Sequence, residues 1–243
     1  ISNPKILDVG CGRGEFLQKW RNYTPYVIGI EHDSKMATIC RSKGIEIIED
    51  NAIDSLQKIS DNSISVITIF HLIEHLEYDQ LFQLLLECSR VLREDGVCII
   101  ETPSIDNLIV STKNFYIDYS HKTHINPDSF SFMVENLGFD KVKHYFLRGG
   151  PLKDAEHSKL TRLLNGVAQD ILFIATKSRS MSNNLFDINK DWQSELSIGI
   201  TTMTAAVDFD LARLQEYKSL EEKILAQKNL INQQGKLLGD INQ

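Results

Sequence analysis

The sequence predicts an α/β protein built on a doubly wound, mainly parallel sheet, and three observations favour this fold class. The chain has 243 residues, 42% of them hydrophobic and 24% charged, which is enough for a sizeable core. Short apolar runs alternate with segments of helical periodicity, and the central runs are almost continuous, as in strands covered on both faces. A cluster of glycines directly follows the first run.

The expected strands are short runs rich in Ile and Val, residues that favour a pleated, buried strand. Each early run ends in residues that favour a turn or a helix start, such as the glycines after the first and Thr-Pro after the fifth. The two late runs are expected to pair antiparallel as a hairpin-like edge. The predicted strands are residues 5–9, 26–30, 45–49, 64–70, 97–101, 139–147 and 169–177.

The segments between the strands carry apolar residues at steps of three and four, which predicts helices that pack one face on the sheet. The late helix has Pro127 in its first turn and ends at Gly138. Residues 102–126, in contrast, are expected to form an irregular insert rich in aromatic, Asp and His residues. The predicted helices are residues 14–21, 34–42, 52–59, 79–92 and 127–137.

The composition becomes polar from Asp187 onward, and sparse apolar residues follow a heptad seam. We expect a domain at 1–178, a linker or helix at 179–207 and a coiled-coil stalk at 208–243 that joins copies of the chain in parallel. The alternative is an amphipathic helix packed on its own domain. The seam positions are Tyr217, Leu220, Ile224, Gln227, Ile231, Gln234, Leu238 and Ile241.

Charge and composition argue against several classes of protein. The 26 basic and 33 acidic residues give a net charge of −7, so we expect no nucleic-acid partner. The longest apolar runs, such as 66–70, are far shorter than the roughly 18 residues of a membrane span. Four cysteines without zinc spacing predict reduced thiols in a cytoplasmic protein, with peripheral attachment at the inner membrane face as an extension of that hypothesis. We recognise no signal peptide, and expect the natural chain to begin before Ile1.

The strongest motif is a glycine loop directly after the first strand. Gly10, Gly12 and Gly14, with Cys11 between the first two, let the backbone turn sharply and approach a ligand closely. A pyrophosphate site would have the spacing GxGxxG, whereas this loop has GxGxG. Asp8, two residues before the first glycine, suits a cationic group of the ligand better than a pyrophosphate.

Polar residues also follow the second and third strands. Glu31, at the end of the second strand, is placed to bind both hydroxyls of a ribose. Asp50, Asn51 and Ala52 follow the third strand, where an amide side chain and a backbone N–H group suit the edge of an adenine. A ribose, an adenine and an amino-acid-like cation together describe S-adenosylmethionine.

The loop, the acid and the Asp-Asn-Ala turn resemble the class I S-adenosylmethionine-dependent methyltransferases over residues 5–177. The resemblance implies a Rossmann-like seven-stranded sheet in the order 3-2-1-4-5-7-6, with strand 7 antiparallel. It also implies that Phe70 and His71, at the end of the fourth strand, border the cofactor. Relatives usually carry Asp where this chain has Asn51, whose amide oxygen can still accept from the adenine amino group.

The segment after the fourth strand bears on the methyl acceptor. It has neither the Pro-Pro-aromatic motif of enzymes that methylate amino groups of DNA bases nor a Pro-Cys nucleophile. His71, Glu74 and His75 would share one face of a helical turn, as metal ligands can, and their spacing resembles the Glu-x-x-Glu-His of ubiquinone-pathway O-methyltransferases. Because a histidine replaces the first Glu, we favour no metal: Glu74 and His75 hydrogen-bond the turn, and His71 alone faces the active site.

The insert at 115–127 is expected to lie over the ligand-binding edge of the sheet. Its aromatic, Asp and His residues suit a sugar, and an alcohol needs a general base because it loses its proton when it is methylated. We expect His121 to be this base, with Asp118 orienting it or binding an acceptor hydroxyl. His124 and His71 are the next candidates, and the alternative is a lid loop whose histidines are merely solvated.

The Asp-x-x-His loop and the Glu101-Thr-Pro turn resemble the methyltransferase modules of bacterial surface-polysaccharide (O-antigen or capsule) assembly. The resemblance implies O-methylation of a sugar hydroxyl, in some relatives to end chain growth. It also implies glycosyltransferase modules or subunits as partners and self-association through the stalk; a dimer and a trimer both fit, and the resemblance slightly favours the trimer. Two other hypotheses stay open: O-methylation of a phenol or quinone precursor, and a cofactor-binding assembly module without activity.

Overall fold

Seven strands form one sheet in the order β3-β2-β1-β4-β5-β7-β6. The computed structural model describes residues 4–188, 191–196 and 198–241, and their side chains except at 194–195 and 236–241. Strand β7 is antiparallel to both of its neighbours, whereas the other neighbouring pairs are parallel, which confirms the predicted sheet. The strands are β1 (Ile6–Val9), β2 (Val27–Ile30), β3 (Glu46–Ile48), β4 (Ile64–Phe70), β5 (Leu92–Pro103), β6 (Lys141–Gly149) and β7 (Ala168–Thr176).

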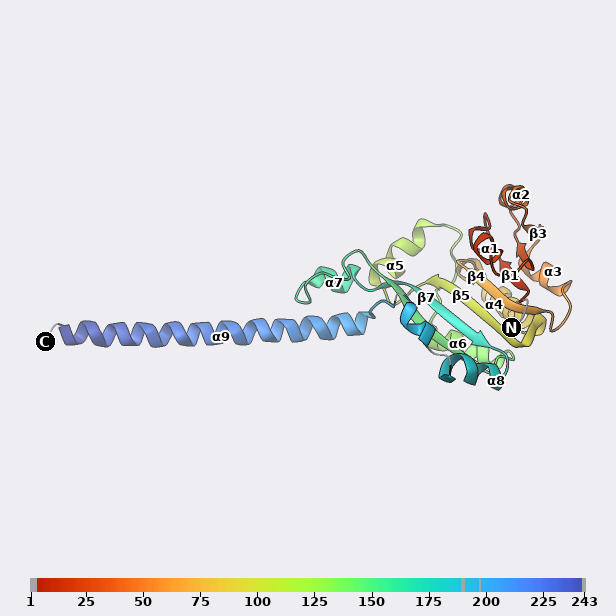
Figure 1. The fold of residues 1–243 in the computed structure, drawn as a ribbon. Helices are drawn as coiled ribbons and strands as arrows, with labels where there is room; N and C mark the ends of the chain where they lie inside the picture. Colours follow the sequence, from red (N-terminus) through yellow and green to blue (C-terminus); the bar gives the residue numbers. More distant parts are fainter. Residues whose placement is uncertain (1–3, 189–190, 197, 242–243) are drawn as a thin grey trace.

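Helices cover both faces of the sheet (Figure 1). They are α1 (Glu15–Trp20), α2 (Ser34–Ser42), α3 (Ala52–Gln57), α4 (Tyr78–Val91), α5 (Leu108–Thr112), α6 (Pro127–Asn136), α7 (Leu160–Asn165), α8 (Arg179–Ser182) and α9 (Thr202–Ile241). Side chains alternate along β1, so Leu7 and Val9 join the core under α3, α4 and α6, while Ile6 joins the core under α1 and α2. The fold is therefore doubly wound, and its carboxyl edge is left free for ligands.

Three segments differ from the prediction. Strand β5 begins earlier than expected because Leu92 pairs with Ile64 across a bulge, which draws the polar residues 93–95 into the strand. The insert at 102–126 is not irregular throughout, since it contains α5 and a 3-10 turn, η2 (Asn114–Ile117). Strands β6 and β7 are antiparallel neighbours as expected, and the chain between them contains a helix that was not predicted, α7.

The long helix α9 projects from the domain and carries the C-terminus to the far end of the molecule (Figure 1). At its root, the Asp106 carboxylate accepts a hydrogen bond from the Thr202 amide at 2.6 Å. Arg162, on α7, pairs with Asp208 at 3.1 Å. These two contacts fix the first turns of α9 against the domain, because they join residues far apart in the sequence.

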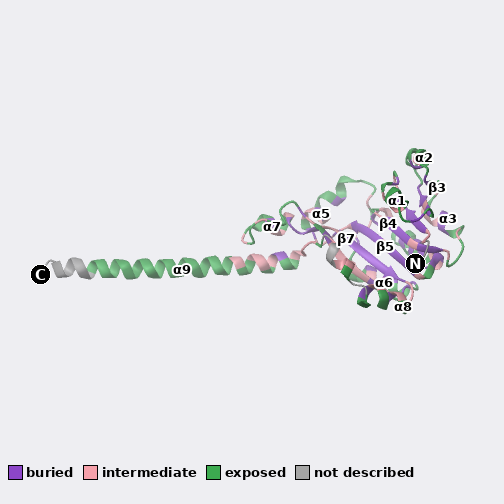
Figure 2. Cartoon of the chain, in the orientation of Figure 1, coloured by how far each residue is buried: buried purple, intermediate pink, exposed green. Residues whose placement is uncertain are grey.

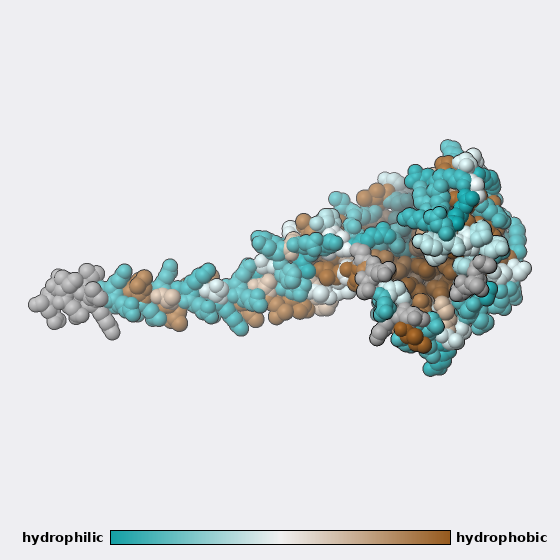
Figure 3. Space-filling view, in the orientation of Figure 1, coloured by the Kyte–Doolittle hydropathy of each residue, from teal (hydrophilic) through white to brown (hydrophobic). Residues whose placement is uncertain are grey.

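The predicted seam of α9 is exposed to solvent (Figure 2). Tyr217 and Ile231 are each 65% exposed, so the described seam residues do not pack on their own domain, which was the alternative. Apolar residues recur between hydrophilic ones along the helix (Figure 3). Leu238 and Ile241, the last seam positions, lie outside the described side chains. Within the described chain, no helix combines the length and apolar character needed to span a membrane.

Candidate active site

The glycine loop between β1 and α1 has a backbone that favours glycine. Gly10, Gly12 and Gly14 have φ angles of 72°, 54° and 73°, all in the left-handed region. A Cβ atom on Gly14 would lie 2.6 Å from the Cδ1 of Ile45, so the loop packs tightly there. A Cβ atom on Gly12 would meet no atom within 4 Å. The backbone at Gly12 is therefore open to a ligand.

Two buried carboxylates flank this loop. Asp8 is 3% exposed, and its Oδ1 accepts a hydrogen bond from the Thr68 hydroxyl at 2.6 Å. Burial raises the pKa of Asp8 to about 6, although the Thr68 hydrogen bond acts in the opposite direction. Glu31 accepts hydrogen bonds from the amides of Gly12 at 2.8 Å and Asp33 at 2.9 Å. The pair of acids suits a ligand that carries a positive charge.

The turn after β3 brings Asp50, Asn51 and Ala52 to the same edge of the sheet. Asn51 is the N-cap of α3, and its Oδ1 accepts from the Ile53 amide at 2.9 Å. Asp50 pairs with Lys58 at 2.6 Å. The amide oxygen expected to meet an adenine is thus engaged in the cap, and the Asn51 NH₂ group is the donor left for a ring nitrogen.

The end of β4 carries Phe70 and His71. Phe70 packs edge-on against Phe16, with ring centroids 4.9 Å apart. The Nε2 of His71 lies 3.3 Å from Glu101 Oε1, and its Nδ1 lies 3.2 Å from Glu74 Oε1. The hydrogen bonds to Glu101 and Glu74 raise the pKa of His71 to about 10. At neutral pH the ring is therefore an imidazolium, which has no lone pair to accept a proton.

Further charges reach His71 from β6 and β7. The Oδ1 of Asp170 lies 3.9 Å from His71 Nε2, and Arg148 contacts both Asp170 and Glu101. Burial raises the pKa of Asp170, partly offset by the charges of His71 and Arg148. Burial also acts on Glu101, but the hydrogen bond from His71 and the charge of Arg148 keep the pKa of Glu101 below its usual value. Three carboxylates, of Glu74, Glu101 and Asp170, thus face His71 and Arg148 in this group.

His71, Glu74 and His75 do not form one group of potential metal ligands among the described residues, although His71 and Glu74 are in contact. His71 has a left-handed backbone, with φ of 51°, and a 3-10 turn, η1 (Ile73–His75), follows. The Nδ1 of His75 lies 2.9 Å from the Ser120 hydroxyl. Glu74 is fully buried. The groups whose potential ligand atoms lie within 4.8 Å of one another are His71–Glu101–Asp170 and Glu74–His75–His121.

Two histidines of the insert, His121 and His124, both contact Phe115. His121 Nδ1 donates to the Phe115 carbonyl oxygen at 2.7 Å, and the His124 ring stacks on the Phe115 ring at 3.8 Å. Asp118 does not hold the His121 ring, contrary to one expectation. Its Oδ1 accepts from the amide and hydroxyl of Ser120 at 2.8 and 2.5 Å, because the turn closes on Ser120 first.

Sequence reasoning missed Thr68, Ser120, Arg148 and Asp170. Thr68 had a weak signal, as a polar residue inside an otherwise apolar strand. Arg148 and Asp170 meet because β6 pairs with β7 in a register that sets Leu147 opposite Asp170. That register depends on the whole sheet, so the sequence around either residue does not indicate the pair.

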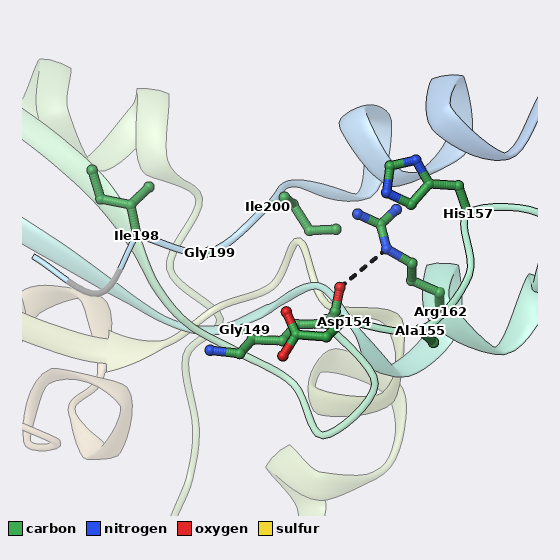
Figure 4. Close-up of a pocket in the computed structure, with 9 residues that line it drawn as sticks. Gly149, Asp154, Ala155, His157, Arg162, Ile198, Gly199 and Ile200 are labelled. Atoms are coloured by element: carbon green, nitrogen blue, oxygen red, sulfur yellow. Dashed lines mark hydrogen bonds between the residues drawn. The ribbon is translucent and has the colours of Figure 1, made fainter. Parts of the chain in front are cut away.

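A separate cavity of about 510 Å³ lies at the root of α9 (Figure 4). Its lining, which includes His157 and Ile200, comes from the β6–β7 connection and the segment before α9. The buried Arg162 donates from Nε to the Lys153 carbonyl at 3.1 Å and pairs with Asp208. Since its buried cation is already paired with α9, the cavity belongs to the joint between domain and helix.

Comparisons with known proteins agree with this fold and edge. A family model described as a methyltransferase domain matches residues 7–100. A probable S-adenosylmethionine-dependent methyltransferase of Mycobacterium tuberculosis is 25% identical over 224 residues, which cover 90% of this chain and 73% of the relative. The crystal structure of an S-adenosylmethionine-dependent methyltransferase from Archaeoglobus fulgidus is 31% identical, covers 72% of this chain and 87% of its own, and has a TM-score of 0.65.

A more distant likeness concerns the fold alone. A Haloferax volcanii methyltransferase structure, solved in complex with the methyltransferase activator Trm112, is 12% identical and has a TM-score of 0.59. It covers 73% of this chain and 84% of its own. The shared architecture therefore extends over the domain at low sequence identity.

Proposed function

The chain belongs to the class I S-adenosylmethionine-dependent methyltransferases, and from that premise we propose that it methylates a sugar hydroxyl of a bacterial surface glycan. Family membership carries methyl transfer and the cofactor. Oxygen as the acceptor atom, and the glycan, are proposals based on the acceptor side of the edge. The observation that carries them is the hydrogen bond from His121 Nδ1 to the Phe115 carbonyl, which leaves His121 Nε2 with a lone pair in the neutral ring.

The residues present fit S-adenosylmethionine. The open backbone at Gly12 leaves room for a ligand, and the buried carboxylates of Asp8 and Glu31 suit its ammonium group and its ribose hydroxyls respectively. We assign the adenine side to the turn after β3 and the methyl side to the end of β4. The proposed cofactor-binding set is Asp8, Gly10, Cys11, Gly12, Gly14, Glu31, Asp50, Asn51, Ala52, Phe70 and His71.

The acceptor hydroxyl needs a base. When bound, S-adenosylmethionine would supply an electrophilic methyl group on a positively charged sulfur; the acceptor oxygen would take this methyl as the C–S bond breaks, and the hydroxyl proton would pass to a base of this chain. His121 suits this role because, in the described structure, its Nε2 makes no hydrogen bond. His71 does not suit it, because Glu101 and Glu74 hold its ring as an imidazolium. We therefore place His121 as the base and His71 beside the methyl group as a fixed positive charge.

A sugar fits the exposed surface of the insert. Tyr116 is 61% and Tyr119 99% exposed, so both rings are available to stack on the apolar face of a sugar. Asp118 is exposed beside them and offers a carboxylate to hydroxyl groups. A phenol or quinone precursor is the competing acceptor, since it would use the same base. Activity that depends on Mg²⁺ would favour that competitor.

Isotope-labelled methyl transfer tests the proposal. The protein is incubated with ¹³C-methyl S-adenosylmethionine and, separately, bacterial surface glycans, simple methyl glycosides, phenols and amines. We expect an O-methyl carbon signal in a glycan or glycoside, and loss of that signal in His121→Ala. Methylation of an amine alone would contradict oxygen as the acceptor atom. Methylation of phenols alone would contradict the glycan but keep the base.

We also propose that residues 208–243 form a parallel coiled-coil stalk, after a domain at 1–178 and a linker at 179–207. The exposed seam supports this, because a lone polar helix is marginal in water and a partner would bury its apolar stripe. Glycosyltransferase modules or subunits are the further partners that we propose. Light scattering on the chain and on a version ending at Val207 tests the stalk. A monomeric chain, or a truncated form that stays oligomeric, would contradict it.

A further inference from the structure

Two histidines beside Glu74, His75 and His121, each have a hydrogen-bond partner at Nδ1 that decides which ring nitrogen carries the hydrogen. His121 Nδ1 faces the carbonyl oxygen of Phe115 at 2.7 Å, and a carbonyl oxygen only accepts hydrogen bonds. In a neutral ring the hydrogen must therefore be on Nδ1. The Nε2 atom of His121 is then a hydrogen-bond acceptor, and no group in the described part of the chain donates to it.

Two hydrogen bonds that meet at Ser120 decide in the same way which nitrogen of His75 carries the hydrogen. The Ser120 hydroxyl has one hydrogen, and it donates this hydrogen to Asp118 Oδ1 at 2.5 Å. Toward His75, 2.9 Å away, the Ser120 oxygen can therefore only accept. This places the hydrogen of a neutral His75 on Nδ1 and leaves its Nε2 as an acceptor. Asp118 thus fixes the tautomer of His75 through Ser120, and it does not hydrogen-bond the His121 ring.

The two rings and Glu74 come together at one place. The ring centroids of His75 and His121 are 4.6 Å apart, edge to face. A nitrogen of each ring and a carboxylate oxygen of Glu74 all lie within 4.8 Å of one another, and Glu74 is fully buried. With Nδ1 of each ring engaged, the two neighbouring rings each offer Nε2 as an acceptor, which suits a ligand that brings two hydrogen-bond donors. Two neighbouring O–H groups, as in a vicinal diol, would supply one donor to each ring.

We propose that the acceptor is a vicinal diol: His121 receives the proton of the hydroxyl that is methylated, and His75, held by Ser120 and Asp118, binds its neighbour. This inference rests on the proposed function for the identity of the base. It adds a substrate class, compounds with adjacent hydroxyls, and a second acceptor-binding histidine. A sugar and a catechol share this chemistry, so the experiment must separate them.

The first arm of the test needs no acceptor. Nitrogen NMR of the ¹⁵N-histidine-labelled chain, with His75→Gln and His121→Gln for assignment, reports which nitrogen of each ring carries the hydrogen. We expect His75 in the Nδ1–H form, a shift toward the Nε2–H form in Ser120→Ala, and the wild-type form in Ser120→Thr, which keeps the hydroxyl. His75 in the Nε2–H form in the wild-type chain would overturn the role of Ser120 and Asp118.

The second arm uses matched probes with S-adenosylhomocysteine bound. One set pairs methyl glycosides of mannose, glucose and galactose with their 3-deoxy analogues, which have no two adjacent hydroxyls. The other pairs catechol with phenol. We expect at least one diol to perturb the His75 and His121 signals and its partner to bind about tenfold more weakly, the value of one good hydrogen bond. His75→Gln should abolish that difference.

The outcomes separate this inference from the glycan proposal. Equal binding within every pair, or no perturbation by any probe, would overturn the diol. Discrimination by catechol and not by the glycosides would keep the diol and overturn the glycan. Stoichiometric Zn²⁺ binding that needs Glu74, His75 and His121 would show a metal centre in place of the diol site.

Discussion

The two halves of the sheet's carboxyl edge are built in different ways. On the cofactor half, β1 to β3 supply a glycine loop and side chains within a few residues of each strand end, such as Glu31 and Asn51. On the proposed acceptor half, ion pairs between strands join residues distant in sequence, as when Arg148 on β6 meets Glu101 on β5. Backbone geometry serves a ligand that many relatives share, whereas long-range side-chain pairs can vary with the acceptor.

The acceptor half also shows that one residue type takes different chemical states. His71 has a carboxylate oxygen at each ring nitrogen, whereas His121 has a backbone carbonyl oxygen at Nδ1 and, in the described structure, no hydrogen bond at Nε2. Both histidines follow a strand or lie in the insert above it, so their positions along the chain do not distinguish them. The neighbours supplied by the fold decide which of the two can accept a proton.

The largest expected effect is on the acceptor half. His121→Ala should lower kcat by about 10²–10⁴-fold, the usual value of a general base, with cofactor affinity unchanged. His157→Ala, at a half-exposed site beside α9, is the matched control and should keep the wild-type rate. Steady-state kinetics and calorimetry measure the two quantities. A near-normal rate in His121→Ala, with a loss in His71→Ala, would move the base to His71.

A substitution in the proposed cofactor half should instead change the affinity for S-adenosylmethionine. Glu31→Ala removes a buried carboxylate proposed to bind the ribose, and should weaken S-adenosylmethionine binding by about 2–4 kcal/mol if two hydrogen bonds are lost. Glu46→Ala, at an exposed position on β3, is the control. Isothermal titration calorimetry gives both affinities. Unchanged affinity in Glu31→Ala would remove Glu31 from the proposed site.

A matched pair of glycines tests how far the loop depends on backbone conformation. Gly12→Ala should cost about 1–2 kcal/mol of unfolding free energy, from the left-handed backbone alone. Gly14→Ala adds an overpacking cost of about 1–3 kcal/mol, because its Cβ would lie 2.6 Å from Ile45 Cδ1. Urea unfolding measures both. Equal losses would mean that the packing at Gly14 relaxes without cost.

The smallest expected effect is a pH dependence of stability from the His71 cluster, because the His71 side chain is 44% exposed and solvent screens its ion pairs. Because the pKa of His71 rises from 6.5 unfolded to about 10 folded, its stabilising effect is complete below pH 6.5 and is lost as the pH rises through about 10. The stability difference between the wild-type chain and His71→Gln should therefore shrink from pH 6.5 to pH 10. Urea unfolding at the two pH values measures it. A constant difference would show that the His71 charge does not stabilise the fold.

The sequence by itself located the strands and the glycine loop, because those signals are local, and the sheet order followed from the family resemblance that the loop carries. Apolar runs such as Ile64–Phe70 define strands through their own residues, and the glycine loop needs only its own backbone. Cofactor-side candidates could be named for the same reason, since each follows its strand directly.

Only the tertiary structure decided the arrangement of the acceptor half. It set Asp170 opposite Leu147, placed His71 and His75 in different side-chain groups, and joined Asp118 to His75 through Ser120. Each of these depends on strand register or on how the insert lies over the sheet. Register and insert position follow from the packing of the whole domain, so residues near either partner in the chain do not encode the contact alone.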